Sequence, residues 1–430
     1  MLEAQKNKIF ALIDCDNFFV SCERVFNPSL EKQPVIVLSN NDGCAVSRSN
    51  EVKKLGIKMG TPIFKIMDLV EKNNIQVFSS NFVLYGDMSH RVMTVLMELF
   101  PNVEIYSIDE AFVELTNMYV NDYWELGIEI RRLVKQYTGI PVSVGIARTK
   151  TLAKAASEIA KKHSQYKGCV DLVDKPDIDN MLELLPVKDV WGVGRSHTKW
   201  LLENNVVNGR QLKYFDKQVI KNKMTVIGER TIMELNGISC IPSGQGPRSP
   251  KSMIHTRSFG NYVESYDDLA DIVSNFTAQV AEKLRSHHQK VNFLEVYIRT
   301  NPNNERQPQY SKLAAVKLPQ PSSYTPDLIR YAKAGLKSIF KPGYKYKKAG
   351  VMFFGLQPEG EVQMDLLGIY NYGNEKRNGK IMRAVDDMNA KMGDCTIKFA
   401  AEGLRQKWHM NQNHKSLRYT TNINEILTIK

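Results

Sequence analysis

The chain has 430 residues, of which 43% are hydrophobic, and its 58 Lys and Arg outnumber its 46 Asp and Glu to give a net charge of +12. This length is too great for one ordinary hydrophobic core and predicts three or four domains. No apolar run approaches the roughly 20 residues that cross a bilayer, and the six cysteines show no zinc or disulfide spacing, so we expect a cytoplasmic protein with reduced thiols.

The first predicted strand ends at an acid. Residues 9–13 form an apolar run that reads as a buried strand, and Asp14 follows it. Farther along, the segment YSIDEAFVEL (106–115) places Asp109 and Glu110 side by side in another strand-like stretch. Side chains alternate along a strand, so these two acids can face one spot only if the strand turns or a cation draws them together.

If the fold brings these two strands together, three carboxylates would face one cavity. Such a set suits a pair of Mg²⁺ ions, which favour carboxylates, water and phosphate oxygens. Taken alone, the 106–115 segment would be better interpreted as an acidic hairpin turn.

Between the two acidic segments, the sequence predicts a small separate substructure. PVIVLS from Pro34 reads as a strand, NNDGC as a turn, and SRSNEVKKLG as a helix that ends at Gly56.

After the second acidic segment, a strand over 141–147 precedes an amphipathic helix. Leu152, Ala155, Ala156 and Ile159 share one face of this helix. The remaining faces, which we expect to be largely solvated, carry Lys150, Lys154, Lys161 and Lys162.

The sequence WGVG at 191–194 lies between two helical patterns, which is the arrangement of a helix-hairpin-helix. Gly192 and Gly194 let the backbone approach a partner closely, and the amides at the next helix N-terminus can bind a DNA phosphate without reading sequence. A Pro, Gly and Ser-rich linker, IPSGQGPRSP (241–250), then marks a domain boundary.

Residues 251–350 contain 16 Lys and Arg against 8 Asp and Glu, a surplus of +8. Strand-like stretches alternate there with helical patterns over 266–287 and 326–340, so we expect an α/β domain. A positive surplus concentrated in one domain favours contact with a phosphate backbone, whereas a scattered one is usually only a solvated surface. From about Gln357 the chain becomes a polar, basic tail.

Three segments in this order, IDCDNFF, LSNNDGCAVSRSNEVKKLGIKMG and YSIDEAF, closely resemble the Y-family (translesion) DNA polymerases, and specifically their UmuC branch. The resemblance covers most of the chain. It implies an α+β multidomain, right-hand polymerase with a ferredoxin-like βαββαβ palm. The implied parts are a palm (1–17 and 84–171), fingers (18–83), a helix-hairpin-helix thumb (172–244), a linker (245–250), a little finger (251–356) and a protein-docking tail (357–430).

The resemblance also implies roles for individual residues. Asp14, Asp109 and Glu110 would be the catalytic metal ligands, joined by the backbone carbonyl of Cys15, and would hold two Mg²⁺ ions. Phe19 would be the steric gate that lies beneath the sugar and excludes a 2′-hydroxyl, although Phe18 and Phe19 also read as core aromatics at a helix start. The other residues implied to contact the incoming dNTP are Phe18, Asn50, Lys53 and Lys161.

Asn50 and Lys53 depart from the pattern of many relatives outside the UmuC branch, which carry a Tyr and an Arg that touch the triphosphate. The UmuC branch tolerates this departure. Lys161 matches the family lysine that holds the incoming triphosphate, and its alternative is a solvated helix face.

Partners follow from the same resemblance. They are primer-template DNA, dNTPs, a bacterial sliding clamp and a UmuD-like accessory subunit. The peptide QMDLL resembles the clamp-docking motif, with Gln363 at the pocket rim and Leu366 and Leu367 in an apolar cleft. The alternative is that the two leucines pin the tail to its own domain.

The sequence therefore predicts a template-directed DNA polymerase for lesion bypass, with positioning and electrostatics in place of a covalent nucleophile. Two alternatives stay open. A nucleotidyl cyclase also uses a two-metal palm, but it has no use for a helix-hairpin-helix or a basic DNA-gripping domain. A non-catalytic DNA-bound scaffold would be expected to have lost an acid, and all three are present.

Overall fold

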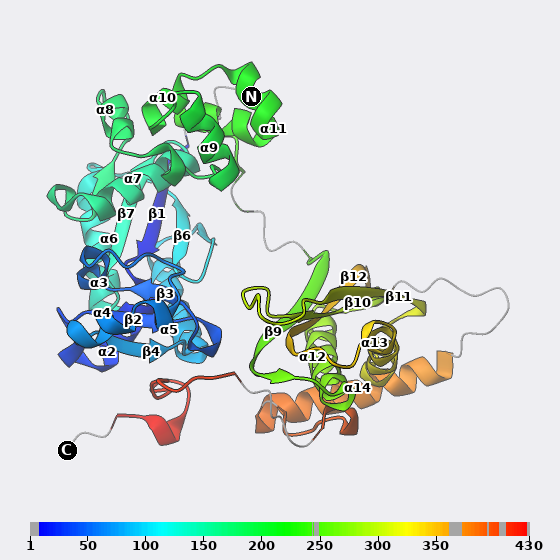
Figure 1. Ribbon diagram of the computed structural model, residues 1–430. Helices are drawn as coiled ribbons and strands as arrows, with labels where there is room; N and C mark the ends of the chain where they lie inside the picture. The colour runs from blue at the N-terminus through cyan, green and yellow to red at the C-terminus, as the bar shows by residue number, and fades with distance from the viewer. Residues whose placement is uncertain are drawn as a thin grey trace. The chain divides into compact units, whose positions relative to one another are not determined.

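The computed structural model describes residues 8–242, 244, 249–360, 372–393, 395–403 and 410–427. The chain divides into two compact units. Unit 1 consists of residues 1–246 and 413–430, and unit 2 consists of residues 247–412 (Figure 1). Within the described ranges, no helix is both long enough and apolar enough to span a bilayer.

A five-stranded sheet forms the centre of unit 1. Its strand order is β5-β6-β1-β7-β8, with β1 antiparallel to both neighbours and β7 parallel to β8. The buried strand predicted over 9–13 forms β1 at the centre of this sheet and continues through Asp14 to Cys15, and both of its faces are covered. The strands are β1 (Phe10–Cys15), β5 (Val103–Ile105), β6 (Glu110–Glu114), β7 (Val142–Ala147) and β8 (Cys169–Asp171).

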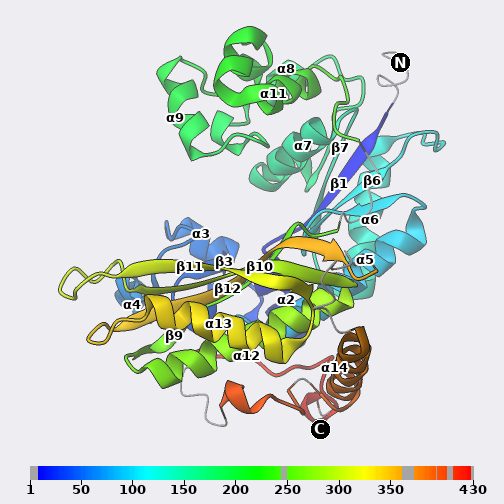
Figure 2. The same cartoon turned by 90° about the vertical axis from the view of Figure 1, so that its right-hand side faces the viewer.

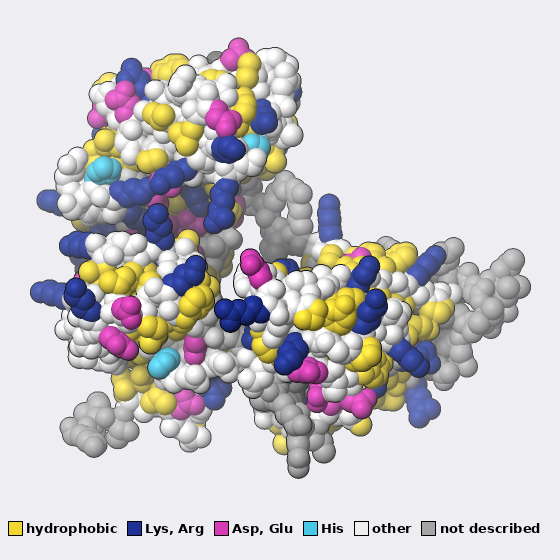
Figure 3. Space-filling view, in the orientation of Figure 1, with side chains coloured by type: hydrophobic (Ala, Val, Ile, Leu, Met, Phe, Trp, Pro, Cys, Tyr) yellow, Lys and Arg dark blue, Asp and Glu magenta, His cyan; other side chains and the backbone are white. Residues whose placement is uncertain are grey.

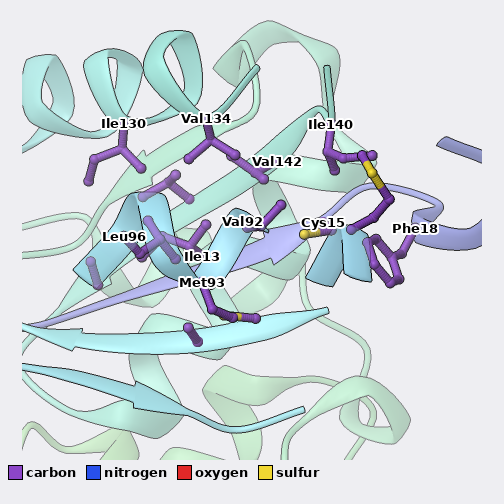
Figure 4. Close-up of a cluster of buried hydrophobic side chains, with 14 of the residues drawn as sticks. Ile13, Cys15, Phe18, Val92, Met93, Leu96, Ile130, Val134, Ile140 and Val142 are labelled. Atoms are coloured by element: carbon purple, nitrogen blue, oxygen red, sulfur yellow. The ribbon is translucent and has the colours of Figure 1, made fainter. Parts of the chain in front are cut away.

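The two faces of this sheet belong to different hydrophobic clusters. Ile13 and Cys15 pack with α2, α5 and α6, as Figure 4 shows, whereas Phe10 and Leu12 pack with α7 on the other face. This is the alternation expected along a strand. The helices are α2 (Phe18–Phe26), α5 (Phe82–Leu99), α6 (Tyr123–Thr138) and α7 (Lys150–Lys162).

A second, three-stranded sheet in unit 1 has its own small core. The strand order is β3-β2-β4, so that β4 lies at an edge. Inward-facing Ile36, Leu38 and Val52 are fully buried. The elements are β2 (Val35–Leu38), β3 (Ala45–Arg48), β4 (Gln76–Ser79), α3 (Asn50–Lys54) and α4 (Met67–Lys72).

Helices α8 to α11 pack beyond α7 and share its hydrophobic cluster. The buried carboxylate of Glu234, at the end of this group, accepts hydrogen bonds from the amides of Thr151, Cys240 and Ile241. It therefore ties the start of α7 to the beginning of the linker. The helices are α8 (Ile178–Glu183), α9 (Arg195–Glu203), α10 (Gly209–Lys213) and α11 (Lys217–Leu235).

Unit 2 is built on a four-stranded antiparallel sheet of order β11-β10-β12-β9. Helices α12 and α13 lie side by side on one face and cover it (Figures 1 and 2). The two helices begin and end within a residue of the predicted ranges. The elements are β9 (Ser252–Val263), α12 (Tyr266–Ser286), β10 (Gln289–Thr300), β11 (Ser311–Ser322), α13 (Thr325–Ile339) and β12 (Tyr346–Pro358).

The C-terminal part of the chain contributes to both units. In unit 2, α14 (Tyr372–Met392) is held by a bidentate ion pair from Arg285 to Asp386, and Asn275 donates to the buried Glu402 at 2.8 Å. Residues from Asn413 onward belong to unit 1. Short 3-10 helices complete the structure at Pro28–Leu30, Asn40–Asp42, Ile63–Lys65, Ser164–Tyr166, Val187–Asp189, Ala400–Glu402 and Ile423–Glu425.

Candidate active site

Three acids meet at one end of the central sheet of unit 1. Asp14 on β1 lies directly opposite Glu110 on β6 in the antiparallel register. The amide of Cys15 donates to the carbonyl oxygen of Asp109 at 2.8 Å. The two acidic segments are therefore adjacent strands, the condition under which their acids could meet, and their acidic positions coincide.

Each acid has a specific partner. Lys161 forms an ion pair with Asp14, and Lys154 Nζ lies 2.9 and 3.0 Å from the two oxygens of Glu110. Asp109 Oδ1 accepts from the hydroxyl of Ser107 at 2.6 Å. Among the residues that the structure describes, no three His, Cys, Asp or Glu side chains converge as a metal-ligating group. Two of the three carboxylates, those of Asp14 and Glu110, are paired with lysines.

The electrostatics of Asp14 reflect its burial. Burial raises the pKa of Asp14 to about 7, although the positive charge of Lys161 opposes the rise, and the negative charge of Glu110 adds to it. Burial lowers the pKa of Lys161, but the carboxylate of Asp14 outweighs this and raises it overall. Burial destabilises the charged form of this carboxylate, and a nearby divalent cation would stabilise it. The donors present are all oxygen atoms, which fit a hard divalent cation such as Mg²⁺.

Helix α7 supplies both of these lysines. Lys154 and Lys161 are seven residues apart, which is about two helical turns, so they share one face. The expectation that Lys154 is solvated is wrong, because that face packs against the end of the sheet. The seven-residue spacing from Lys161 could have shown from the sequence that Lys154 faces the same site.

Lys150 is a second correction to the predicted solvated lysines. Its side chain is only 1% exposed and lies 2.8 Å from both carboxylate oxygens of Glu104. Its ammonium also lies over the rings of Phe10 and Phe112, at 5.7 and 5.2 Å from the centroids. A buried charge of this kind needs such partners, and those partners come from distant strands that helical periodicity does not reveal.

The two phenylalanines after Asp14 have different environments. Phe18 is 4% exposed and belongs to the core, as Figure 4 shows. Phe19 is only partly buried, and its ring stacks on that of Tyr85 with centroids 4.5 Å apart and planes 14° apart. Sequence reasoning did not identify Tyr85, which comes from α5.

The residues expected at the triphosphate lie near one another in unit 1. Asn50 Oδ1 accepts from Asn17 Nδ2 at 3.2 Å. Partial burial, followed by the positive charges of Arg48 and Lys161, lowers the pKa of Lys53. Arg48, which sequence reasoning passed over, donates to the carbonyl of Ile57 at 2.9 Å, whereas its buried Nε has no hydrogen-bond partner among the residues that the structure describes. Figure 3 shows Lys and Arg side chains gathered over this part of unit 1, which suits an anionic ligand.

The WGVG turn leads into α9. Gly192 has φ of +91°, a left-handed conformation that favours glycine. Gly194 is the N-cap of α9 and provides no side-chain cap. Trp191 Nε1 donates to the hydroxyl of Tyr106 at 3.2 Å, and Lys154 lies over both rings, so this turn also contacts the acidic end of the sheet. The proposed clamp residues Gln363, Leu366 and Leu367 lie outside the described residues.

Comparison with known families assigns three regions of the chain. Residues 13–158 match the impB/mucB/samB family, residues 250–366 match the C-terminal domain of that family, and residues 379–429 match a domain of unknown function.

Whole-chain relatives agree with these matches. The chain is 41% identical to Protein UmuC of Salmonella typhimurium, over 98% of this chain and 100% of that protein. It is 39% identical to Protein ImpB of the same organism, over 97% and 99%, and 24% identical to DNA polymerase IV of Clostridium kluyveri, over 91% and 97%. A solved Y-family DNA polymerase chimera (Dbh-Dpo4-Dbh) shares the fold with a TM-score of 0.64 at 20% identity, over 81% of this chain and 99% of that chain.

Proposed function

Because the chain belongs to the UmuC branch of the Y-family DNA polymerases, within the impB/mucB/samB family, we propose that Asp14, Asp109 and Glu110 form its catalytic centre. The protein is a DNA-directed DNA polymerase of translesion synthesis and SOS mutagenesis. The observation that carries the assignment is the register pair of Asp14 and Glu110, with Asp109 beside them at the end of the same sheet.

Members of this family use divalent metal, and we propose two Mg²⁺ ions in this chain. Asp14, Asp109, Glu110 and the carbonyl of Cys15 would hold them. When bound, the ions lower the pKa of the primer 3′-hydroxyl and neutralise charge on the leaving pyrophosphate. The oxygen donors and the raised pKa of Asp14 support this site, since a buried carboxylate is stabilised by a cation.

Positive side chains of unit 1 would neutralise and orient the triphosphate. Lys161 is the central one, and it lies close enough to Lys53, as does Arg48, for its positive charge to lower the pKa of Lys53. Asn50 would contribute a polar contact. The unpartnered Nε of Arg48 supports a role for this residue too, because a buried donor without a partner is costly.

Selection against ribonucleotides is assigned to Phe19. Its ring is partly buried and stacked on Tyr85, whereas the neighbouring Phe18 is fixed in the core, with its ring centroid 5.7 Å from that of Phe19. A rigid aromatic surface beneath the sugar would leave no room for a 2′-hydroxyl.

We further propose that the open face of the unit 2 sheet contacts DNA. Along β10, buried side chains that face the helices alternate with side chains that point to the open face. Tyr297 and Arg299 are among those on the open face. Phe293 and Phe354 stack there at 5.4 Å, and Lys348 lies over the ring of Tyr297. The amides that follow Gly192 and Gly194 would provide a second phosphate contact.

We also propose a division of the chain into domains that matches these roles. Palm (1–17 and 84–171), fingers (18–83), thumb (172–244) and little finger (251–356) would divide the work of catalysis, nucleotide selection and DNA binding. We also propose cytoplasmic location, clamp docking through Gln363, Leu366 and Leu367, and a UmuD-like accessory subunit.

A primer-extension assay tests the function. The purified chain, with Mg²⁺ and each dNTP, is expected to add templated nucleotides on undamaged and abasic templates. Pyrophosphate release from nucleotide without primer would favour a cyclase. DNA binding with no extension, even with the accessory subunit added, would favour a scaffold.

A further inference from the structure

Residues 413–425, here called the C-terminal segment, are part of unit 1. The amide of Ser79 donates to the carbonyl of His414 at 3.0 Å, and the amide of His414 donates to the Ser79 hydroxyl at 3.0 Å. The amide of Asn413 donates to Asp42 Oδ2 at 2.8 Å. The segment therefore begins at the end of β4, the edge strand of the smaller sheet.

The segment then continues over the buried side chain of Asn81. Asn81 Nδ2 lies 3.1 Å from the carbonyl of Ser416 and 3.2 Å from that of Leu417. Farther on, the ring of Tyr419 stacks on that of Phe26 with centroids 4.8 Å apart and planes 16° apart. These contacts fix the backbone on both sides of Ser416.

Ser416 meets a buried carboxylate at this point. Its hydroxyl donates to Glu23 Oε1 at 3.0 Å, and the same oxygen accepts from the hydroxyl of Tyr85 at 2.6 Å. Glu23 is 2% exposed and Tyr85 is 0% exposed. Burial raises the pKa of Glu23, and both hydroxyl groups lower it. A buried carboxylate depends on such hydrogen bonds for its position.

The same tyrosine supports the proposed steric gate. Glu23 and Phe19 are four residues apart on α2 and so share a face of that helix. Tyr85 is fixed through its hydroxyl by Glu23 and stacks with its ring on Phe19. A continuous series of contacts thus runs from Ser416 through Glu23 and Tyr85 to Phe19.

We propose that Ser416 is a positioning residue for sugar selection. Through Glu23 and Tyr85, it fixes where the Phe19 ring lies beneath the incoming sugar. The inference rests on the proposed role of Phe19. Small displacements at such a surface have large effects, since a shift of about 1 Å can change a rate by about 100-fold.

The test compares insertion of dATP and rATP opposite template T by the full-length protein. Ser416→Ala is expected to lower the ratio of kcat/KM for dATP over rATP by about threefold to tenfold, the effect of one hydrogen bond. Ser416→Thr keeps the hydroxyl and should preserve the ratio. Lys415→Ala is the matched control, because Lys415 is the exposed neighbour of Ser416.

A second variant tests whether the effect of Ser416 passes through Glu23 and Tyr85. Tyr85→Phe removes the hydroxyl that shares the Glu23 oxygen, so it should lower the ratio in the same direction. Combining it with Ser416→Ala should give less than the product of the two separate effects.

Phe19→Ala in the same assay separates the two proposals. If Phe19→Ala leaves the ratio unchanged, the gate assignment fails and this inference fails with it. If Phe19→Ala lowers the ratio but Ser416→Ala and Tyr85→Phe do not, only the role of Ser416 is overturned. An equal loss of both rates in Ser416→Ala, with the ratio unchanged, would mean that the segment only stabilises the fold.

Discussion

At the scale of single residues, the proposed site consists of three acids and the lysines that pair with two of them. Asp14 and Glu110 are each paired with a lysine of α7, whereas Asp109 has only a hydroxyl partner in the contacts described. Substituting these acids will therefore have unequal effects on folding. Removing the charge of Glu110 leaves the largely buried Lys154 without its carboxylate, and removing that of Asp109 leaves no lysine behind.

Asp109→Asn should reduce nucleotide addition by at least about 100-fold, because it removes a proposed metal ligand from a centre that works by electrostatics. DNA binding and thermal stability should stay near those of the parent. Glu110→Gln should abolish addition equally but also lower the unfolding temperature. Single-turnover insertion, DNA binding and thermal unfolding measure the three effects.

Glu125→Gln, in the exposed first turn of α6, is the matched control and should keep full activity. Near-normal insertion by Asp109→Asn would contradict the assignment of the metal centre.

Sequence reasoning found the residues whose chemistry is local and missed those defined by distant partners. Adjacent acids in an apolar strand are unusual in themselves, so Asp109 and Glu110 stood out. Glu23 and Tyr85 look ordinary in sequence, because their roles arise from side chains 62 residues apart that meet only in the fold. Ser416 lies 393 residues from Glu23 and had no local signal at all.

At the scale of elements, periodic segments were predictable and irregular ones were not. The helix of unit 2 predicted over 266–287 forms α12 at Tyr266–Ser286, since its apolar spacing and its Ser265 N-cap act locally. The C-terminal segment has no such pattern. It was expected only as a polar tail, and its place in unit 1 depends on hydrogen bonds to β4 and α2.

One strand of unit 2 carries a histidine that should respond to pH. Partial burial, followed by the positive charge of Arg257, lowers the pKa of His255 from its ordinary 6.5 to about 4. Arg257 Nε also donates to His255 Nε2 at 3.1 Å, which requires a neutral imidazole. Between pH 6.5 and 4, the unfolded chain therefore binds a proton that the folded chain does not.

Stability should accordingly fall as the pH drops from 6.5 toward 4. His255→Gln should make this fall smaller, as measured by thermal unfolding at pH 7 and pH 5. His287→Gln, at an exposed position after α12, should retain the full pH dependence. If His255→Gln lost as much stability on acidification as the parent, titratable groups other than His255 would cause the loss.

The peptide at 363–367 makes a separate prediction for clamp docking. Leu366→Ala with Leu367→Ala should leave single-nucleotide addition unchanged but remove clamp stimulation of long extension. The affinity of such a peptide rests on a few apolar anchors, and a DNA-bound polymerase meets the clamp at high effective concentration. Asp365→Ala, in the polar spacer position, should retain stimulation. Full stimulation in the double variant would leave the leucines without a docking role.

At the scale of the whole molecule, DNA affinity should depend on the open sheet face of unit 2. Arg299→Gln with Lys348→Gln should reduce the slope of log affinity against log salt by about 1.8, since each lost phosphate contact removes about 0.9 of a counterion. Equilibrium binding of primer-template at several salt concentrations measures the slope.

The control for this experiment is Arg330→Gln with Lys337→Gln, on exposed positions of α13 in the helix layer. If both double variants reduced the salt dependence of DNA affinity equally, the positive charge of unit 2 would act over its whole surface and not through the open sheet face. Deleting all residues from 251 onward is a weaker test, because it would also remove the C-terminal segment from unit 1.

The return of residues 413–425 to unit 1 makes unit 2 an insertion within unit 1. On the ribosome, the strands with the three acids emerge early, but Glu23 and Tyr85 receive Ser416 only after residues 247–412 have been made. At about 5–20 residues per second, the 306 residues from Glu110 to Ser416 take roughly 15 to 60 s. A nascent chain would thus have its acids in place before Ser416 can reach Glu23, so the proposed support of the Phe19 ring would be completed last.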